Sequence, residues 1–305
     1  MMKTFPHATR AAALALSAAA LLAASALAPA APARQQQQNQ NQQQQQQQRA
    51  QKKKLQASSN FAQYAGRDAS NRLIAGGATR GDMTDEAGQF EQKGQEAFEA
   101  SKYADAVAAF KRLTELRPTS ARAFYHLGVA YEAAGRYKEA VETYKRAAGL
   151  AQGKEMSALR AISYYNMGNS YAADNQPKEA VGAYKQVIAL APEQAVAHYN
   201  LGLAYAAAGQ PQDAVAEFNE AIKLKADYAE AFFNLGITYG NLGQYGDAAA
   251  AFKRAAQIKP DYAEAHYNLG LAYLALDDKK NAQAEIKTLE TINKTLAAKL
   301  KSLSQ

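Results

Sequence analysis

The sequence predicts an all-α solenoid of about six helix–turn–helix units, preceded by a disordered arm and followed by a C-terminal helical extension. One observation is a literal repeat, since the nine residues Ala197–Tyr205 recur unchanged at Ala265–Tyr273. A second is a glycine that returns every 34 residues, with one interval of 40. A fixed period of this length is the signature of a repeat architecture. These glycines are Gly94, Gly128, Gly168, Gly202, Gly236 and Gly270.

A third observation is helical spacing in the first half of each unit. With the repeated glycine numbered as position eight, an aromatic residue or His, then Leu or Met, then Gly, then Tyr recur at positions four, seven, eight and eleven. The fifth unit shows the pattern as Phe232, Leu235, Gly236 and Tyr239. The spacing i, i+3, i+4, i+7 places such residues on one face of an α-helix. A short turn follows, which contains a glycine in three units: Gly135, Gly209 and Gly243.

The second half of each unit predicts another helix, packed closely on the first. Alanine stands at position twenty of all six units, and a bulky residue follows four positions later. Pro177 and Pro211 suit a first helical position, while Pro118, Pro192 and Pro260 end three units. We expect the glycine and the alanine to let the two helices approach, with the bulky residues filling the flanking gaps. The bulky residues are Phe110, Tyr144, Tyr184, Phe218, Phe252 and Ile286.

The period also gives the domain organisation. We expect a repeat domain over 87–305, with a six-residue insertion before the third unit that lengthens a helix. No Gly or Pro follows Asp278, so the second helix of the last unit is expected to run on as one C-terminal helix to residue 305. Leu289, Leu296 and Leu303 would form a heptad seam on it, which predicts a dimer. We favour the alternative, a monomer in which this helix caps the last unit, because terminal repeats must cover their apolar face. The units lie near 87–120, 121–154, 161–194, 195–228, 229–262 and 263–296.

The units resemble the tetratricopeptide repeat, with which they share the 34-residue period and the order of aromatic, Leu-Gly, Tyr, Ala, Phe and Pro residues. The resemblance covers about 87–294. Departures are the absence of Trp, and Gln152 and Ala226 where the terminal proline would stand. The resemblance implies a right-handed superhelix whose first helices form a concave groove, and a non-enzymatic role in binding an extended segment of another protein.

Asparagine and aromatic residues occupy the face of the first helices that this resemblance assigns to the groove. An asparagine side chain has donors and an acceptor, so it can hold the backbone of an extended peptide. The arrangement is similar to the asparagine ladder of the O-linked N-acetylglucosamine transferases, although the transferase part is missing. The alternative is that asparagine is simply common there in the family. We expect these positions to lie off the core, so that alanine substitutions leave the fold unchanged. The predicted groove residues are Asn166, Asn200, Asn234, Asn268, Tyr165, Tyr199, Phe233, Tyr267 and Asn169.

The N-terminal part of the chain has a different composition. Lys3 and Arg10, an apolar run, and the small residues Ala31 and Ala33 predict a signal peptide over 1–33. The Gln-rich, basic stretch 34–86 predicts a disordered arm. We therefore expect export to a periplasm or cell surface. The alternatives are a membrane anchor formed by an uncleaved N-terminal segment, and targeting to an organelle.

The charge distribution argues against nucleic acid as a partner. The net charge of +7 comes from residues 1–85, which hold 10 basic and 3 acidic residues. The remaining 25 basic and 25 acidic residues cancel, so the repeat domain lacks the excess positive charge that nucleic-acid binding requires. A weak contact of the basic arm with an anionic envelope stays open.

The sequence offers no support for catalysis. It contains no cysteine, no phosphate-binding loop and no nucleophile-elbow motif. His198 and His266 stand two units apart, roughly 20 Å at ~10 Å per helix step, too far to share a metal ion. We expect them to fill the aromatic core position, and we expect no catalytic residue, metal or cofactor. The predicted function is a scaffold in bacterial envelope assembly. The alternatives are a subunit that positions substrates for a separate enzyme, and a tethered spacer acting through the arm.

Overall fold

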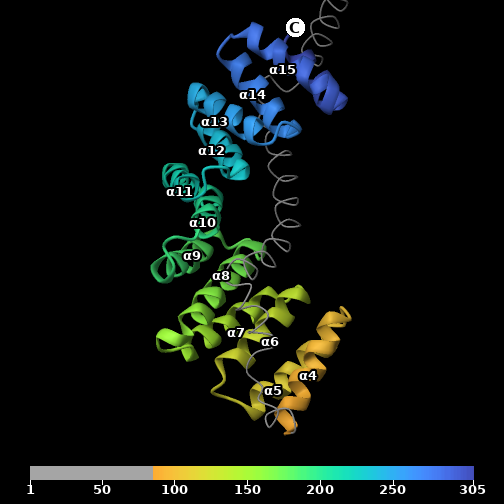
Figure 1. Cartoon of the computed structure of the whole chain (residues 1–305), viewed down its shortest axis with the longest axis vertical. Helices are drawn as coiled ribbons and strands as arrows, with labels where there is room; N and C mark the ends of the chain where they lie inside the picture. Colours follow the sequence, from red (N-terminus) through yellow and green to blue (C-terminus); the bar gives the residue numbers. More distant parts are fainter. Residues whose placement is uncertain (1–84) are drawn as a thin grey trace, which may run out of the picture. The chain divides into compact units, whose positions relative to one another are not determined.

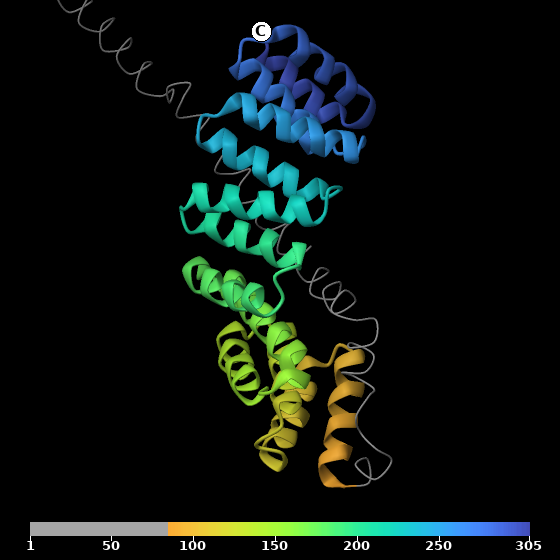
Figure 2. The same ribbon diagram turned by 60° about the vertical axis from the view of Figure 1, so that its left-hand side comes forward.

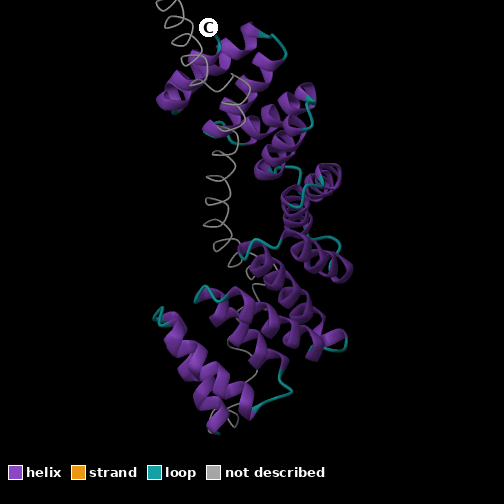
Figure 3. Ribbon diagram, turned by 180° about the vertical axis from the view of Figure 1, so that it is seen from behind, coloured by secondary structure: helices purple, strands orange, loops and turns teal. Residues whose placement is uncertain are grey.

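The computed structural model describes residues 85–305. The predicted signal peptide over 1–33, and the predicted arm up to residue 84, lie outside the described residues. Between residues 85 and 305 the chain forms thirteen α-helices and one 3-10 turn, without a strand (Figure 3). Each helix packs on the helices before and after it in the sequence, as Figures 1 and 2 show. The prediction of an all-α, right-handed superhelical solenoid of helix–turn–helix units is confirmed.

Six helical hairpins make up the stack, each with a first and a second helix. The first helices are α4 (Glu86–Glu99), α6 (Ala121–Ala133), α8 (Ser157–Ala173), α10 (Ala195–Ala207), α12 (Ala229–Asn241) and α14 (Ala263–Ala275). The second helices are α5 (Tyr103–Leu116), α7 (Tyr137–Leu150), α9 (Pro177–Leu190), α11 (Pro211–Leu224), α13 (Tyr245–Ile258) and α15 (Lys279–Ile292). The turn η1 (Lys154–Met156) precedes α8, and α16 (Lys294–Leu303) follows α15.

The repeated glycines let the two helices of a hairpin cross in contact. A Cβ atom at Gly202 would lie 2.7 Å from the ring of Phe218, closer than side-chain atoms pack. Alanine at position twenty is buried in all six units. The predicted close crossing is therefore confirmed in five units. The five glycine–ring pairs are Gly94–Phe110, Gly128–Tyr144, Gly168–Tyr184, Gly202–Phe218 and Gly236–Phe252.

The sixth hairpin differs from the prediction. The side chain against Gly270 is Leu300 of α16 rather than Ile286 of α15. Ile286 is fully buried in the same cluster, together with Leu289 and Ala297. The C-terminal helix thus supplies the group that closes the last glycine site.

The expected lengthened helix is present. Helix α8 has 17 residues, whereas α10, α12 and α14 have 13 each. The extra residues form one more helical turn at the start of α8 together with the 3-10 turn η1. The inserted residues are therefore absorbed between the second and third hairpins without breaking the stack, since α7 still packs on α8.

The expectation of one continuous C-terminal helix is wrong. Helix α15 ends at Ile292, and Asn293 adopts φ −158° and ψ 89°. The Asn293 side chain accepts a hydrogen bond from the backbone N–H of Leu296 at 3.1 Å. Asparagine is a favoured N-cap because its side chain satisfies a backbone donor that the new helix leaves open. Asn293 therefore ends one helix and begins another without a glycine or a proline.

Helix α16 folds back on α14 and α15 and covers the end of the stack. Of the three predicted seam leucines, Leu289 is fully buried within the chain, Leu296 is half-buried and Leu303 is 47% exposed. The leucines expected to form one seam therefore do not share an exposed face. The packing is that of a capping helix.

Candidate functional site

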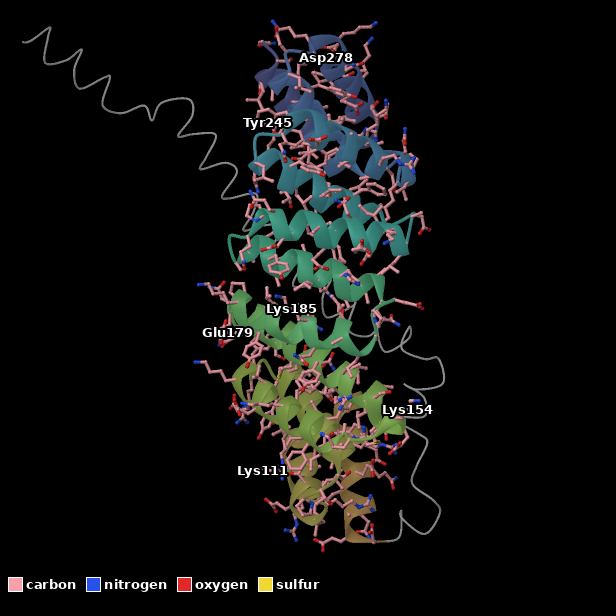
Figure 4. All side chains as sticks on the ribbon, turned by 90° about the vertical axis from the view of Figure 1, so that its left-hand side faces the viewer. Lys111, Lys154, Glu179, Lys185, Tyr245 and Asp278 are labelled. Carbon is pink, nitrogen blue, oxygen red and sulfur yellow. The ribbon has the colours of Figure 1, made fainter. Side chains whose placement is uncertain are left out.

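The first helices form one face of the stack, which we call the inner face: the surface of α6, α8, α10, α12 and α14. At three junctions neighbouring first helices contact each other directly, α6 with α8, α10 with α12, and α12 with α14. No two neighbouring second helices contact each other to the same extent within the described chain. The second helices carry exposed polar side chains, among them Lys111, Glu179 and Lys185 in Figure 4. The predicted groove residues all lie on the first helices that form this inner face.

Three of the predicted asparagines join neighbouring units. Each donates a hydrogen bond from its side-chain amide to the hydroxyl of a tyrosine at position five of the preceding unit. The pairs are Asn166 with Tyr125 at 3.4 Å, Asn200 with Tyr165 at 2.8 Å, and Asn234 with Tyr199 at 3.0 Å. We call this series the Asn–Tyr ladder.

The expectation that these asparagines lie off the core is wrong for Asn166, Asn169 and Asn200. Their exposed fractions are only 6%, 5% and 4%. Asn169 accepts a hydrogen bond from the Tyr184 hydroxyl at 2.7 Å. The physical reason is that positions six and nine of α8 and position six of α10 face neighbouring helices, and tyrosine hydroxyls there need polar partners. Contact of these amides with a peptide stays a prediction, but each already has a structural role.

The ladder ends in the sixth unit. Asn268 donates to the backbone carbonyl of Glu264 in its own helix at 2.7 Å. The aromatic residue at position five of the preceding unit is Phe233, which has no hydroxyl. Asn234 and Asn268 are half-buried, unlike Asn166 and Asn200. These two are therefore the predicted ladder members whose side chains a ligand can reach most easily.

The predicted aromatic residues are mostly packed between helices. Tyr165, Phe233 and Tyr267 are 1%, 5% and 6% exposed, and only Tyr199 is half-buried. The Tyr199 ring lies 4.9 Å from the Tyr228 ring, and burial raises the pKa of the Tyr199 hydroxyl far above its usual value. These packed rings serve mainly to hold the first helices in place.

A row of aliphatic side chains remains partly exposed on the inner face. They occupy position nine, one turn beyond the Asn–Tyr ladder, and each packs at its base against the core. Acidic residues stand at position two of the last two units, Glu230 and Glu264. The face thus offers apolar contact beside amides and carboxylates. The aliphatic row consists of Val129, Leu203, Ile237 and Leu271.

At the aromatic core position His198 is buried, as expected, and His266 is half-buried. Both repeated histidines also form polar clamps, which were not predicted from the sequence. In each, Nδ1 lies 2.7 Å from a glutamate of the second helix, and Nε2 lies near the carbonyl of the proline that ends the preceding unit. The hydrogen bond that His266 donates to Glu285 raises the pKa of His266. One side chain therefore ties three segments together. The clamps are Pro192–His198–Glu217 and Pro260–His266–Glu285.

The sequence contains a signal for the Asn–Tyr ladder that the spacing within a single unit does not reveal. Tyr165 precedes Asn200 by 35 residues, and Tyr199 precedes Asn234 by the same number. A donor and an acceptor separated by one period plus one residue are placed side by side when units stack. For the histidines the corresponding signal is a glutamate 19 residues later in both units.

The described part of the chain shows neither a metal site nor a membrane span. Among residues 85–305, no three His, Asp or Glu side chains come together in a way that could hold a metal ion. None of the helices there has the length and apolar character needed to cross a bilayer.

Comparison with protein families identifies the repeats. Tetratricopeptide repeat models match residues 91–155, 165–229, 217–250 and 263–295, and a further TPR repeat model matches 241–277. No curated protein is similar to the chain at a significant level.

Several solved structures share the fold. YrrB, described as a TPR protein with an unusual peptide-binding site, is 25% identical with a TM-score of 0.53, over 65% of this chain and 100% of YrrB. MamA from residue 41 to its end, from Desulfovibrio magneticus RS-1, is 22% identical, with a TM-score of 0.53, over 59% of this chain and 98% of that solved chain. The C-terminal part of a TPR repeat-containing protein from Cytophaga hutchinsonii is 17% identical, with a TM-score of 0.57, over 66% of this chain and 78% of that solved chain.

Proposed function

Because the chain belongs to the tetratricopeptide repeat family, we propose that it is a non-enzymatic scaffold that binds an extended segment of another protein on its inner face. The observation that carries the proposal is the aliphatic row, which places partly exposed Val129, Leu203, Ile237 and Leu271 at the same position of α6, α10, α12 and α14. At this position α8 carries the buried Asn169 instead. An extended peptide could lay alternate side chains against such a row. The peptide-binding site named for YrrB supports this choice of ligand.

The same face offers polar contacts for the peptide backbone. Asn234 and Asn268 are half-buried, and each donates hydrogen bonds from its amide nitrogen. The carbonyl oxygens of these amides are suited to accept from peptide N–H groups. Each such bond contributes roughly 0.5–1.5 kcal/mol net, and ordering a flexible ligand costs several kcal/mol. We therefore expect an affinity of about micromolar.

We further propose that the scaffold acts outside the cytoplasm, in assembly of a bacterial envelope. The support is the N-terminal sequence, with basic residues, an apolar run and the Ala31 and Ala33 pair typical of a cleaved signal peptide. N-terminal sequencing of exported protein tests this step. A mature chain that begins near Arg34 would support it, and one that begins at Met1 would contradict it.

Matched leucine substitutions test the binding face. Leu203→Glu places a charge in the aliphatic row, whereas Leu224→Glu makes the same change at a residue of α11 that is 40% exposed. The probe is an immobilised set of random peptides of about 15 residues, presented to the full chain. We expect Leu203→Glu to abolish capture of the peptides that the wild type binds, and Leu224→Glu to retain it. Circular dichroism checks that both variants stay helical. Equal capture by all three proteins would contradict the proposed face.

A further inference from the structure

One carboxylate on the inner face has no counterpart in the other units. Glu132 stands at position twelve of α6, where the other first helices carry Phe98, Ala172, Ala206, Gly240 and Leu274. Tyr125, Val129 and Glu132 follow at i, i+4 and i+7, so they share one helix face. That face already contributes to the aliphatic row and to the Asn–Tyr ladder. Glu132 therefore belongs to the surface on which the peptide is proposed to lie.

Neutral hydroxyls and amides surround this carboxylate. The Tyr144 hydroxyl donates a hydrogen bond to Oε2 of Glu132 at 2.7 Å. The Tyr125 ring lies 6.0 Å from the Tyr144 ring, and the Tyr125 hydroxyl accepts a hydrogen bond from the Asn166 amide at 3.4 Å. Burial raises the pKa values of tyrosines from four successive helices, Tyr125, Tyr144, Tyr165 and Tyr184, and the charge of Glu132 adds to each increase. All these groups are uncharged at neutral pH, so none of them neutralises the carboxylate.

No cation among the described residues pairs with Glu132. The arginine closest in sequence, Arg136, forms an ion pair with Glu139 at 2.7 Å and stacks on the Tyr131 ring. Burial raises the pKa of Glu132 to about 7, while the hydrogen bond from Tyr144 acts in the opposite direction. Oε1, the second oxygen, has no hydrogen-bond partner among residues 85–305, and the side chain is half-buried rather than sealed. A cation placed beside such a carboxylate favours its ionised form.

We propose that Glu132 and the surrounding tyrosines form a site for a basic side chain, preferably arginine, of the peptide bound on the inner face. This inference rests on the proposed function and specifies the ligand. A guanidinium group can donate to Oε1 while it lies against a tyrosine ring. Arginine suits the site better than lysine because its guanidinium is more weakly hydrated and matches a carboxylate with paired donors.

The site has a consequence for pH dependence. A cation binds the ionised carboxylate, whereas the protonated form offers only a neutral partner. Near pH 7 the free protein holds Glu132 partly protonated, so binding of the cation must release a proton. The preference for a basic side chain should therefore grow as the pH rises from about 5.5 to 8.

Peptides that carry arginine or citrulline at the same position separate the effect of side-chain charge from that of side-chain shape. Citrulline has nearly the same shape as arginine and no charge. Each random peptide that the full chain binds is made twice, with arginine or with citrulline at the same place, and both affinities are measured by fluorescence anisotropy. We expect the arginine form to bind about tenfold more tightly at pH 8, with the ratio falling toward one at pH 5.5. This comparison within the wild type needs no variant.

Glu132→Gln keeps the shape of the side chain and removes its charge. We expect it to bring the arginine-to-citrulline ratio to about one at every pH. Glu142→Gln makes the same change at an exposed residue of α7 and should keep the wild-type ratio. A ratio of one in the wild type at pH 8, or an unchanged ratio in Glu132→Gln, would overturn the proposal while leaving peptide binding itself intact.

Small-molecule probes test the Glu132 site even if no peptide binds to the chain. Failure of all peptides to bind would contradict the proposed function but not the site. The probes are N-ethylguanidinium and its uncharged analogue N-ethylurea. We expect the guanidinium to shift the Tyr144 ring resonances saturably in the wild type, and neither probe to do so in Glu132→Gln. Equal shifts with the two probes would contradict the proposed site for a basic side chain.

Discussion

The amide of Asn200 donates a hydrogen bond to the hydroxyl of Tyr165 at 2.8 Å, and the two residues belong to neighbouring repeat units. Both side chains are buried, at 4% and 1% exposure. The helices that carry them, α10 and α8, contact each other less than α10 and α12 do. This hydrogen bond therefore lies at a junction with few other direct contacts between first helices.

Loss of this hydrogen bond is expected to destabilise the stack. Asn200→Ala leaves the Tyr165 hydroxyl without its donor in a buried place, which costs about 1–3 kcal/mol of unfolding free energy. Tyr165→Phe should cost a similar amount, and the double variant less than the sum. Urea unfolding of the single and double variants measures the coupling.

The matched control is Asn268→Ala. Its amide bonds only within its own helix, to Glu264, so we expect a change within about 0.5 kcal/mol. Equal destabilisation by Asn200→Ala and Asn268→Ala would show that the Asn200–Tyr165 hydrogen bond adds nothing to the unfolding free energy beyond a bond within one helix.

The repeat period predicts contacts within a hairpin better than contacts between hairpins. Gly202 and Phe218 are 16 residues apart in one unit, and their types alone suggest a small residue under a ring. Asn200 and Tyr165 meet only after two units stack. Position six looks free when a helix is considered alone, because the hydroxyl that it contacts comes from another helix. Burial of Asn200 therefore depends on the register between units.

The C-terminal break was hidden for a related reason. An asparagine such as Asn293 does not by itself indicate the end of a helix, and no glycine or proline stands near it to mark the change of direction. The break becomes favourable because α16 can bury Leu300 against the open side of Gly270. Tertiary packing decides such a boundary, and local helix propensity is too weak to oppose it.

The glycine under Phe218 is expected to tolerate no side chain. In Gly202→Ala the new methyl group would lie 2.7 Å from the ring of Phe218, which is fully buried. Overpacking of this kind costs about 1–3 kcal/mol. Gly182 lies inside α9, where an added Cβ atom would meet nothing within 4 Å, so Gly182→Ala should instead stabilise by roughly 0.5–1 kcal/mol. Thermal unfolding of both variants checks the opposite signs, and a stabilised Gly202→Ala would refute the close crossing.

The His266 clamp predicts a pH-dependent stability. Glu285 raises the pKa of His266 above its usual value, so the protonated ring favours the folded state. This contribution is fully present below about pH 6.5 and is lost as the pH rises through the raised pKa. We expect the wild type to exceed His266→Phe in stability by roughly 1 kcal/mol near pH 6 and by less near pH 8.5.

Two glutamate variants on α15 test the cause. Glu285→Gln removes the partner that raises the pKa of His266, so in that background the stability lost on His266→Phe should no longer depend on pH. Glu290→Gln changes an exposed residue of the same helix and should leave the pH dependence in place. Urea unfolding at several pH values measures each difference, and an identical pH profile for wild type and Glu285→Gln would contradict the clamp.

The capping role of α16 can be separated from pairing by two leucines of the same helix. Leu300 is fully buried against Gly270, whereas Leu303 is 47% exposed. Leu300→Ser should lower the unfolding free energy by about 2–5 kcal/mol, because it opens a cavity over the last hairpin. Leu303→Ser should change it by less than about 0.5 kcal/mol. Light scattering on the wild type adds the oligomeric state, for which we expect a monomer. A dimer that Leu303→Ser dissociates, with the fold intact, would instead show that the exposed end of α16 is a pairing surface.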